Sequence, residues 1–306
     1  MDVSIIIVNY NTRELLRNCL ESIYQHTINI NFEVIVSDNG SQDGSVEMIK
    51  KDFSQVILIE NNANLGFGTA NNRGLAVAKG KYIFYLNSDT ILLNNAVKMF
   101  YDYWETSPEK ESIGALGCNL LDGEGNVTHS FGPFPSSKKI IKDTTFDFLR
   151  IIRLTVFFFL KESFSFTRKQ TPQKEKTPFY GTVDYIIGAD LFLRNNEYAQ
   201  FDEKYFLYYE DTDLQKKLEF GGFYRQIIKG PVIQHLEHKS NKFTKKIDFY
   251  RSTGKVHRFL SSIIFLRKNK KSGFVLFYLK FIISLCWLSP CLIKSNIKFI
   301  PKLWSL

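Results

Sequence analysis

Cysteine and proline are scarce in this sequence, and acidic residues almost disappear after His238. The four cysteines, Cys19, Cys118, Cys286 and Cys291, form no CxxC pair and no metal-ligand spacing, which excludes a disulfide framework and a structural zinc site and fits a reducing compartment. The 8 prolines and 18 glycines in 306 residues exclude a collagenous or largely disordered chain. No basic region precedes the first apolar run and no cleavage signal follows it, so we do not expect export.

Charge is distributed unevenly along the chain. The formal net charge is +9, but residues 239–306 hold 15 Lys and Arg and a single acid, Asp248, whereas residues 1–238 hold 25 basic and 30 acidic residues. A body with a charge of −5 is therefore followed by a tail with a charge of +14. A basic tail suggests nucleic-acid binding, but that function class explains neither the apolar run inside the tail nor the acidic loops of the body.

The first 120 residues alternate short β-branched runs with helical patterns, as βαβ units do. We therefore expect an α/β fold with a Rossmann-like, mostly parallel sheet flanked by helices. The loops after successive strands meet at the carboxyl edge of such a sheet, where open α/β folds bind ligands. The expected strands are residues 3–9, 32–37, 56–60, 82–86 and 113–119, and the expected helices are residues 12–24, 42–51, 67–78 and 94–105.

Two apolar segments depart from this pattern. Residues 134–180 form an expected insertion, with an apolar and aromatic helix at 146–166 and a polar linker after it. In the tail, residues 273–293 are long enough to cross a hydrocarbon core of ~30 Å, but cationic residues on both flanks conflict with a single crossing. We expect a re-entrant hairpin or an interfacial helix there, with a buried helix of a soluble core as the alternative.

Carboxylates occupy three of the polar loops. Asp38 can accept a hydrogen bond from a pyrimidine base or a ribose hydroxyl, although Asp-Asn-Gly is also ordinary turn chemistry. Asp89 can hold a hard divalent cation that keeps positions open for substrate phosphates, or it can cap a helix. The acids at 210–213 either complement a helix dipole or, beside aromatic residues, have raised pKa values suited to a general base. A dinucleotide site is not indicated, because Asn71 stands where the pattern Gly66-x-Gly68-x-x-Gly needs its last glycine.

These motifs, in this order, closely resemble family 2 glycosyltransferases over about residues 3–238. The agreement is carried by five stretches: 5–11 (IIIVNYN), 37–45 (SDNGSQDGS), 64–74 (NLGFGTANNRG), 86–90 (LNSDT) and 208–214 (YYEDTDL). Within the family the chain looks most like rhamnosyltransferase-type members that extend lipid-linked polysaccharides.

The resemblance implies a GT-A fold and an inverting transfer from a nucleotide-diphosphate sugar. The resemblance also implies roles for single residues. Asp38 would contact the donor base, and the DxD-like stretch 87–89 would contact the diphosphate. Asp211 would be the catalytic base, and Asp89 and His235 would bind Mg²⁺ or Mn²⁺. Asn87 takes the place of the first acid, so Asp89 is the only carboxylate of that stretch. The full donor-binding set is Asn9, Asn11, Asp38, Asn39, Asn64, Gly66, Asn72, Asn87, Ser88 and Asp89, and the acceptor side is Tyr209, Glu210 and Asp213.

The function expected from the sequence is transfer of a sugar from dTDP-rhamnose or a UDP-sugar to a lipid-linked or cell-surface polysaccharide. No QxxRW motif follows the acids, so we expect a non-processive enzyme. Residues 1–238 form the expected catalytic domain, and the basic residues 239–306 associate with an anionic membrane on its cytoplasmic face. The alternative is a catalytically silent homologue that only binds nucleotide sugars.

Overall fold

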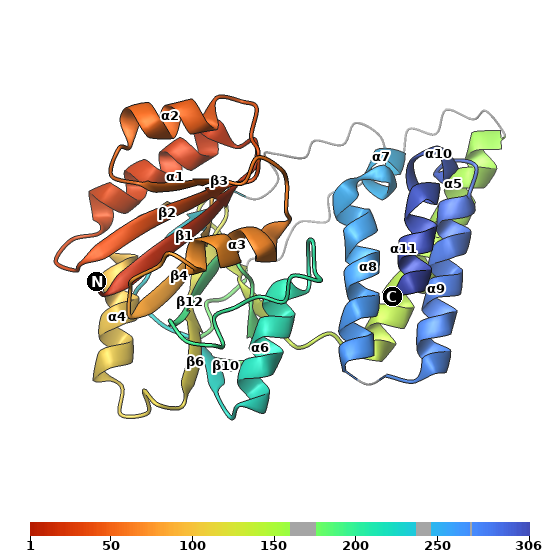
Figure 1. The fold of residues 1–306 in the computed structure, drawn as a ribbon. Helices are drawn as coiled ribbons and strands as arrows, with labels where there is room; N and C mark the ends of the chain where they lie inside the picture. The colour runs from red at the N-terminus through yellow and green to blue at the C-terminus, as the bar shows by residue number, and fades with distance from the viewer. Residues whose placement is uncertain (160–175, 237–245, 270) are drawn as a thin grey trace. The chain divides into compact units, whose positions relative to one another are not determined.

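The computed structural model describes residues 1–159, 176–236, 246–269 and 271–306, and these divide into two compact units (Figure 1). The described residues of 1–134, 176–206 and 210–236 form the first unit. Those of 135–159, 207–209 and 246–306 form the second. The second unit therefore takes in residues 135–159 of the insertion and the short segment 207–209 as well as the described residues of the basic tail.

An eight-stranded sheet in the order β10-β13-β6-β12-β4-β1-β2-β3 organises the first unit. Its centre, β4-β1-β2-β3, is parallel, and β12 runs antiparallel between β4 and β6. The predicted mostly parallel sheet is thus confirmed. The strands are β1 Val3–Asn9, β2 Phe32–Asp38, β3 Ile57–Glu60, β4 Tyr82–Asn87, β6 Ile113–Gly117, β10 Gly181–Val183, β12 Asp190–Arg194 and β13 Tyr224–Ile227.

Helices cover both faces of this sheet, and β1 shows why. Its side chains alternate between the faces: Ile5 and Ile7 belong to one buried cluster and Ile6 to another. Helices α1, α2 and α4 supply the first cluster, and α3 and α6 the second. These helices are α1 Arg13–His26, α2 Ser45–Asp52, α3 Phe67–Leu75, α4 Ala96–Thr106 and α6 Glu210–Phe220.

A small sheet in the order β5-β14-β7-β8 joins distant parts of the chain at one end of the main sheet. Strand β14 pairs antiparallel with β5, so that His235 lies opposite Thr90. This pairing brings the last residue of β14 beside the loop that follows β4. The strands are β5 Thr90–Leu92, β7 Asn119–Leu121, β8 Val127–His129 and β14 Ile233–His235, and β9 Phe131–Gly132 pairs separately with β11 Tyr185–Ile186.

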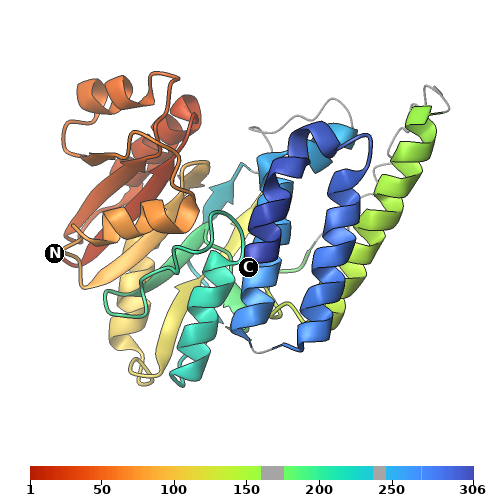
Figure 2. The ribbon, with the colours of Figure 1, turned by 45° about the vertical axis from the view of Figure 1, so that its right-hand side comes forward.

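The second unit is helical, and its long helix α5 runs beside α9 in both ribbon views (Figure 1, Figure 2). Lys255 of α8 forms a buried ion pair with Asp147 of α5, and the Tyr250 hydroxyl donates to the same carboxylate at 3.1 Å. The helices are α5 Ser137–Phe159, α7 Lys246–Arg251, α8 Thr253–Lys268, α9 Gly273–Leu288, α10 Ile293–Asn296, the 3₁₀ helix η1 Ile297–Phe299 and α11 Ile300–Ser305. Among the residues described, none of the helices has the length and apolar character needed to cross a membrane.

Candidate active site

Strand register gathers the predicted donor-binding residues at the carboxyl edge of the sheet. Asn9 ends β1 and pairs with Asp38, which ends β2, while Val8 pairs with Asn87, which ends β4. Three adjacent parallel strands therefore deliver an amide, a carboxylate and a second amide to the same edge. This arrangement follows from the sequence pattern, because Asn9 and Asn87 directly follow the apolar runs of β1 and β4, and Asp38 follows that of β2 after one serine.

Asp38 organises the loop that follows β2. Its side chain is almost fully buried. One carboxylate oxygen, Oδ1, accepts from the backbone N–H groups of Gly40 at 3.0 Å and Ser41 at 2.8 Å. The other oxygen, Oδ2, accepts from Asn9 Nδ2 at 2.7 Å. The carboxylate is thus satisfied within the chain, as turn chemistry predicts, and contact with a donor base stays a prediction.

Thr12 connects the end of β1 to the loop that follows β4. Its hydroxyl donates to Asn9 Oδ1 at 2.6 Å and lies 3.0 Å from the hydroxyl of Ser88. On the outer side, Asn11 adopts a positive φ of 54°, and its backbone N–H donates to Ser41 Oγ at 2.9 Å. Asn9, Asn11, Asp38 and Ser88 therefore belong to one hydrogen-bonded set.

Amide side chains hold the loop after β3 against the loop after β2. Asn39 Nδ2 donates to the carbonyl of Gly66 at 3.1 Å, and Asn39 Oδ1 accepts from Asn61 Nδ2 at 3.1 Å. Asn64 Oδ1 accepts from the Gly66 N–H at 3.0 Å. These contacts place Asn39, Asn64 and Gly66 beside Asp38, and their part in donor binding stays a prediction.

Asn72 lies apart from this set. It is buried in α3, where its side chain bonds to the Phe201 backbone: Nδ2 donates to the carbonyl at 2.9 Å and Oδ1 accepts from the N–H at 2.9 Å. Both ends of the amide are therefore engaged in fixing α3 to the segment before α6.

Asp89 and His235 meet across the β5–β14 pairing. Their closest atoms, Asp89 Oδ1 and His235 Nε2, are 3.1 Å apart, and Asn87 Nδ2 lies 3.5 Å from the same ring nitrogen. The Leu236 N–H donates to the Asp89 carbonyl at 2.9 Å and closes the pairing. His235 is buried, whereas the Asp89 side chain remains 23% exposed. The predicted metal pair is thus in contact, although no group of three or more His, Cys, Asp or Glu side chains suited to a metal ion occurs in the part of the chain that the structure describes.

Asp211 lies at the start of α6, next to residues 188–189, which precede β12. Its Oδ2 accepts from the Gly188 N–H at 3.1 Å, and its Oδ1 accepts from the Thr212 N–H at 2.7 Å. Burial raises the pKa of this carboxyl above its usual range, and the hydrogen bonds oppose that shift. The carbonyl of the next residue, Ala189, accepts from the Asn87 N–H at 3.2 Å. Neighbouring backbone groups therefore hold both Asp211 and the end of β4.

The predicted acceptor-side residues divide between the two units. Glu210 and Asp213 are buried in the first turn of α6, where carboxylates also complement the helix dipole, and the Tyr205 hydroxyl donates to Asp213 Oδ1 at 3.3 Å. Tyr209 belongs to the second unit, where its ring lies 5.4 Å from that of Phe265 in α8.

Comparison of the sequence with models of known protein families identifies the family of this chain. Residues 4–165, more than half of the chain, match the family model described as Glycosyl transferase family 2. The chain belongs to glycosyl transferase family 2. The predicted family is thus confirmed, and the matched region includes the polar loops from Asn9 to Asp89.

Curated family 2 relatives carry specific names. The chain is 31% identical over 121 residues to a poly(ribitol-phosphate) beta-glucosyltransferase of Bacillus spizizenii, covering 38% of this chain and 19% of that protein. It is 26% identical over 224 residues to an N-acetylglucosaminyl-diphospho-decaprenol L-rhamnosyltransferase of Mycobacterium tuberculosis, covering 68% of this chain and 67% of that protein. Of the first three such relatives, the matches span only between 19% and 49% of their length.

Solved structures of other proteins share the fold. A mannosyltransferase of Pyrobaculum calidifontis, solved in complex with GDP-Man and Mn²⁺, superposes with a TM-score of 0.53 at 14% identity. The superposition covers 99% of this chain and 73% of that one. At this identity the likeness concerns the fold, which agrees with the predicted GT-A architecture.

Three residues of this family 2 site escape prediction from the sequence alone. In the sequence, Thr12 is indicated only as a helix cap, and nothing distinguishes Gly188 from the other glycines of the chain. Asp190 has a clearer signal, because it is an acid at the start of the apolar run that forms β12. It is fully buried, and its Oδ2 accepts from the Cys118 N–H at 2.8 Å. Burial raises the pKa of Asp190 to about 8.

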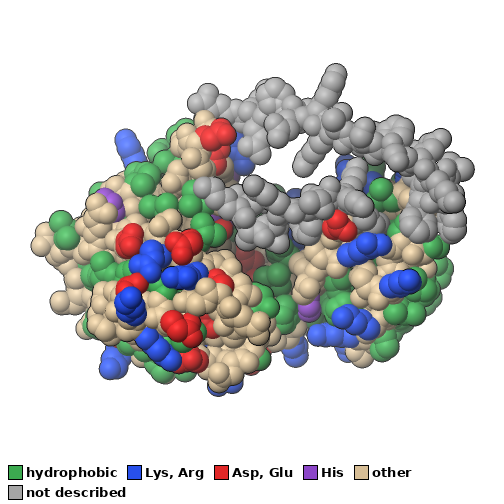
Figure 3. Space-filling model, turned by 90° about the horizontal axis from the view of Figure 1, so that it is seen from above, with side chains coloured by type: hydrophobic (Ala, Val, Ile, Leu, Met, Phe, Trp, Pro, Cys, Tyr) green, Lys and Arg blue, Asp and Glu red, His purple; other side chains and the backbone are tan. Residues whose placement is uncertain are grey.

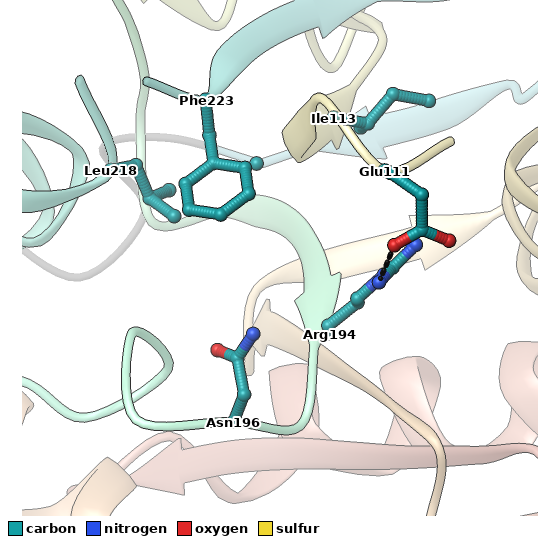
Figure 4. A pocket seen from close by; sticks show the side chains of 7 residues that line it. Glu111, Ile113, Arg194, Asn196, Leu218 and Phe223 are labelled. Carbon is teal, nitrogen blue, oxygen red and sulfur yellow. Dashed lines mark hydrogen bonds and ion pairs between the residues drawn. The ribbon is translucent and has the colours of Figure 1, made fainter. Parts of the chain in front are cut away.

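A cavity of about 220 Å³ lies elsewhere in the first unit (Figure 4). Its lining includes Ile113, the first residue of β6, and Arg194, the last residue of β12, so it opens at the amino end of β6. Arg194 forms an ion pair with Glu111 at 2.8 Å, drawn as a dashed line in Figure 4. This cavity is therefore at the edge opposite Asp38 and Asp89, and we assign it no part in donor binding.

Proposed function

We propose that this chain is an inverting glycosyltransferase that moves a sugar from a nucleotide-diphosphate donor to a hydroxyl of a lipid-linked glycan. The observation that carries the proposal is the contact between Asp89 and His235 at the sheet edge that also holds Asp38 and, beside β12, Asp211. A carboxylate–imidazole pair suits a diphosphate site, and a separate carboxylate of raised pKa suits a base.

The donor set of the Asp89–His235 pair fits a divalent cation. One carboxylate oxygen and one ring nitrogen converge, with the Asn87 side chain beside them. Two protein ligands leave coordination positions for water and for diphosphate oxygens, as Mg²⁺ and Mn²⁺ sites do. Asp89 and His235 would hold the cation, which would supply positive charge to neutralise the leaving diphosphate. The Mn²⁺ bound in the mannosyltransferase complex, a structure of similar fold, supports this proposal.

Asp211 acts on the acceptor in this proposal. Inversion needs the acceptor hydroxyl to attack the anomeric carbon on the face opposite the diphosphate, so the base must come from a different loop than Asp89. Asp211 Oδ2 accepts the hydroxyl proton as the new bond from oxygen to carbon forms, and the bond from carbon to the diphosphate oxygen breaks. Burial favours this role, because a carboxylate of raised pKa holds the transferred proton better at neutral pH.

The substrate classes are proposed from the relatives. The rhamnosyltransferase name refers to a decaprenol-linked acceptor, and the mannosyltransferase was solved with a nucleotide-diphosphate sugar. They support a nucleotide-diphosphate sugar as donor and a lipid-linked acceptor as substrate classes. Within these classes we propose dTDP-rhamnose or a UDP-sugar as donor and a lipid-linked or cell-surface polysaccharide as acceptor, as predicted from the sequence. The absence of a QxxRW motif supports transfer of one or a few residues.

Two substitutions test the assigned roles. Asp211→Asn keeps the size of the side chain but removes its basicity, so we expect transfer to fall by about a hundredfold or more while donor affinity changes little. Asp89→Ala removes a diphosphate-side ligand, so we expect donor affinity and turnover to fall together. Nucleotide release from UDP-, dTDP- and GDP-sugars with Mg²⁺ or Mn²⁺ measures turnover, and calorimetry measures donor binding.

Glu219→Gln is the matched control, because Glu219 lies on the same helix as Asp211 and forms an ion pair with Lys216 at the surface. We expect it to leave transfer unchanged. Near wild-type turnover of Asp211→Asn would refute its role as the base. No nucleotide release from any donor by the wild-type chain, with donor binding retained, would instead indicate the silent homologue.

A further inference from the structure

Helix α9 exposes an unbroken apolar stripe. Its outward residues are Phe274, Phe277, Phe281, Leu285 and Leu288, spaced three or four apart so that they lie on one side of the helix. Phe274 is 77% exposed. A helix at a water-exposed surface normally turns polar residues outward, so this stripe needs a covering phase or partner.

Helix α5 carries a second exposed apolar stripe, formed by Phe146, Leu149, Ile152 and Val156. The two helices are joined by hydroxyl contacts: Thr145 Oγ1 lies 3.1 Å from the Tyr278 hydroxyl, and Thr155 Oγ1 lies 2.6 Å from Ser289 Oγ. These pairs show that α5 and α9 run parallel. With 3.6 residues per turn, each stripe lies about a quarter turn around its helix from the hydroxyl residues that join the two helices. The two quarter turns run in opposite directions, so both stripes lie on the same side of the helix pair. The stripes therefore form one apolar face.

The surroundings of this face are strongly cationic. The described residues of the second unit carry 16 Lys and Arg against three acids, Asp143, Asp147 and Asp248. Asp147 is already paired with the buried Lys255 and lies 3.9 Å from the exposed Arg150. On α5, the exposed Arg150 and Arg153 lie among the apolar residues, and their long stems can lie along an apolar phase while the charges reach its boundary. Figure 3 shows hydrophobic side chains beside Lys and Arg along the right-hand margin of the molecule.

We propose that this α5–α9 face lies on the surface of an anionic lipid bilayer, with its apolar stripes in the interfacial region and its cations at the headgroups. Helices that combine an apolar stripe with Lys and Arg residues bind to such a surface. A second copy of the chain fits the face less well, because docking like on like would place cationic residues against one another. The anionic leaflet is the cytoplasmic one predicted from the sequence. The proposal concerns a surface outside the transfer site, and it is tested without donor or acceptor.

Trp304 offers a probe in the wild-type chain. Its ring lies 5.8 Å from that of Phe277, and it is 43% exposed, whereas Trp104 and Trp287 are buried. The full-length protein is mixed with vesicles of phosphatidylglycerol and phosphatidylcholine, or of phosphatidylcholine alone, whose acyl chains carry bromine as a quencher. We expect quenching with the anionic vesicles at low salt, and we expect Trp304→Phe to remove most of it.

Vesicle flotation with variants tests the stripe directly. We expect Phe274→Gln with Phe281→Gln to weaken binding to the anionic vesicles by about tenfold or more, and Arg150→Gln with Arg153→Gln to weaken both the binding and its salt dependence. Phe220→Gln is the matched control, because Phe220 is 78% exposed but belongs to the first unit. We expect the control to bind like the wild type.

Three outcomes would overturn the proposal. They are no binding of the wild-type chain to anionic vesicles at low salt, equal loss of binding in the Phe220 control, and a wild-type dimer that the Phe274 and Phe281 changes dissociate. If the α9 variants do not fold, judged by circular dichroism, the quenching of Trp304 in the wild-type chain decides the question. Loss of transfer in the Asp211 variant leaves all of these readouts unaffected, so failure of either proposal can be recognised separately.

Discussion

At the scale of single residues, Gly66 links two parts of the candidate site. It has a positive φ of 87°, and the Phe206 carbonyl, which accepts from the Phe67 N–H at 2.9 Å, lies where a side chain would have to go. A Cβ at this position would stand 2.2 Å from that oxygen. The glycine is therefore required twice, by the backbone conformation and by the close approach of the segment before α6.

Gly66→Ala should accordingly destabilise the first unit by about 1–3 kcal/mol. Gly125→Ala is the control, because Gly125 has a φ of 86° and nothing within 4 Å of its Cβ position. The control should show only the smaller conformational cost of a positive φ, about 1 kcal/mol. Urea unfolding measures both variants, and equal losses would show that the contact with Phe206 contributes nothing.

At the scale of elements, the periodicity of the sequence predicts the first unit well because local pattern and tertiary burial agree there. β1 spans the predicted residues 3–9, and β2 and β4 each end one residue later than expected. The helix of the insertion begins at Ser137 rather than near residue 146, because its first turns alternate lysines with apolar residues and lack a continuous apolar signal. The predicted linker at 168–176 lies largely outside the described residues.

Long-range pairings were harder to derive than the elements themselves. The contact of His235 with Asp89 joins residues 146 positions apart and depends on the pairing of β14 with β5. Within the sequence, only the family resemblance indicates this contact. The burial of Asn72 against Phe201 has no local signature at all. A sequence pattern reports which face a residue occupies, but not which distant strand or segment covers it.

The contact between α5 and α8 in the second unit depends on a buried charge pair that composition alone would not reveal. Lys255 and Asp147 are both buried, and the Lys255 ammonium lies 4.6 Å from the centre of the Phe259 ring. Burial lowers the pKa of Lys255, while the charge of Asp147 raises it. We expect Lys255→Met to cost about 3 kcal/mol, because it leaves the buried Asp147 carboxylate with only a weaker ion pair to the exposed Arg150 at 3.9 Å.

The combination Asp147→Leu with Lys255→Met should recover most of that loss, since neither charge then remains. Lys98→Met is the surface control, because Lys98 pairs with Asp102 on an exposed side of α4 and should cost about 1 kcal/mol or less. Chemical unfolding followed by circular dichroism gives all three values. A loss for Lys255→Met as small as that of the control would mean that the buried pair contributes no more than an exposed one.

At the scale of the whole molecule, the division of charge found in the sequence corresponds only partly to the division of the structure. The sequence places a boundary near residue 238, and the described residues of the basic tail, 246–269 and 271–306, belong to the second unit. That unit also takes in the described residues of 135–159 and the segment 207–209, which the charge balance assigns to the acidic body. Net charge is summed along the chain, whereas the units are defined by packing between elements distant in sequence.

The stability of the folded chain should depend on pH through Asp190. Burial raises its pKa to about 8, although His235 nearby opposes the shift, whereas an unfolded aspartate titrates near ~3.9. The folded state therefore keeps a proton that the unfolded state releases, so the contribution to stability is complete below about pH 4 and is lost as pH rises toward 8. In Asp190→Asn, whose Oδ1 can still accept from the Cys118 N–H, this part of the pH dependence should vanish. Free energies of unfolding in urea at pH 5, 6, 7 and 8 measure the difference between the two proteins. A difference that stays constant across this range would show that folding does not raise the pKa of Asp190.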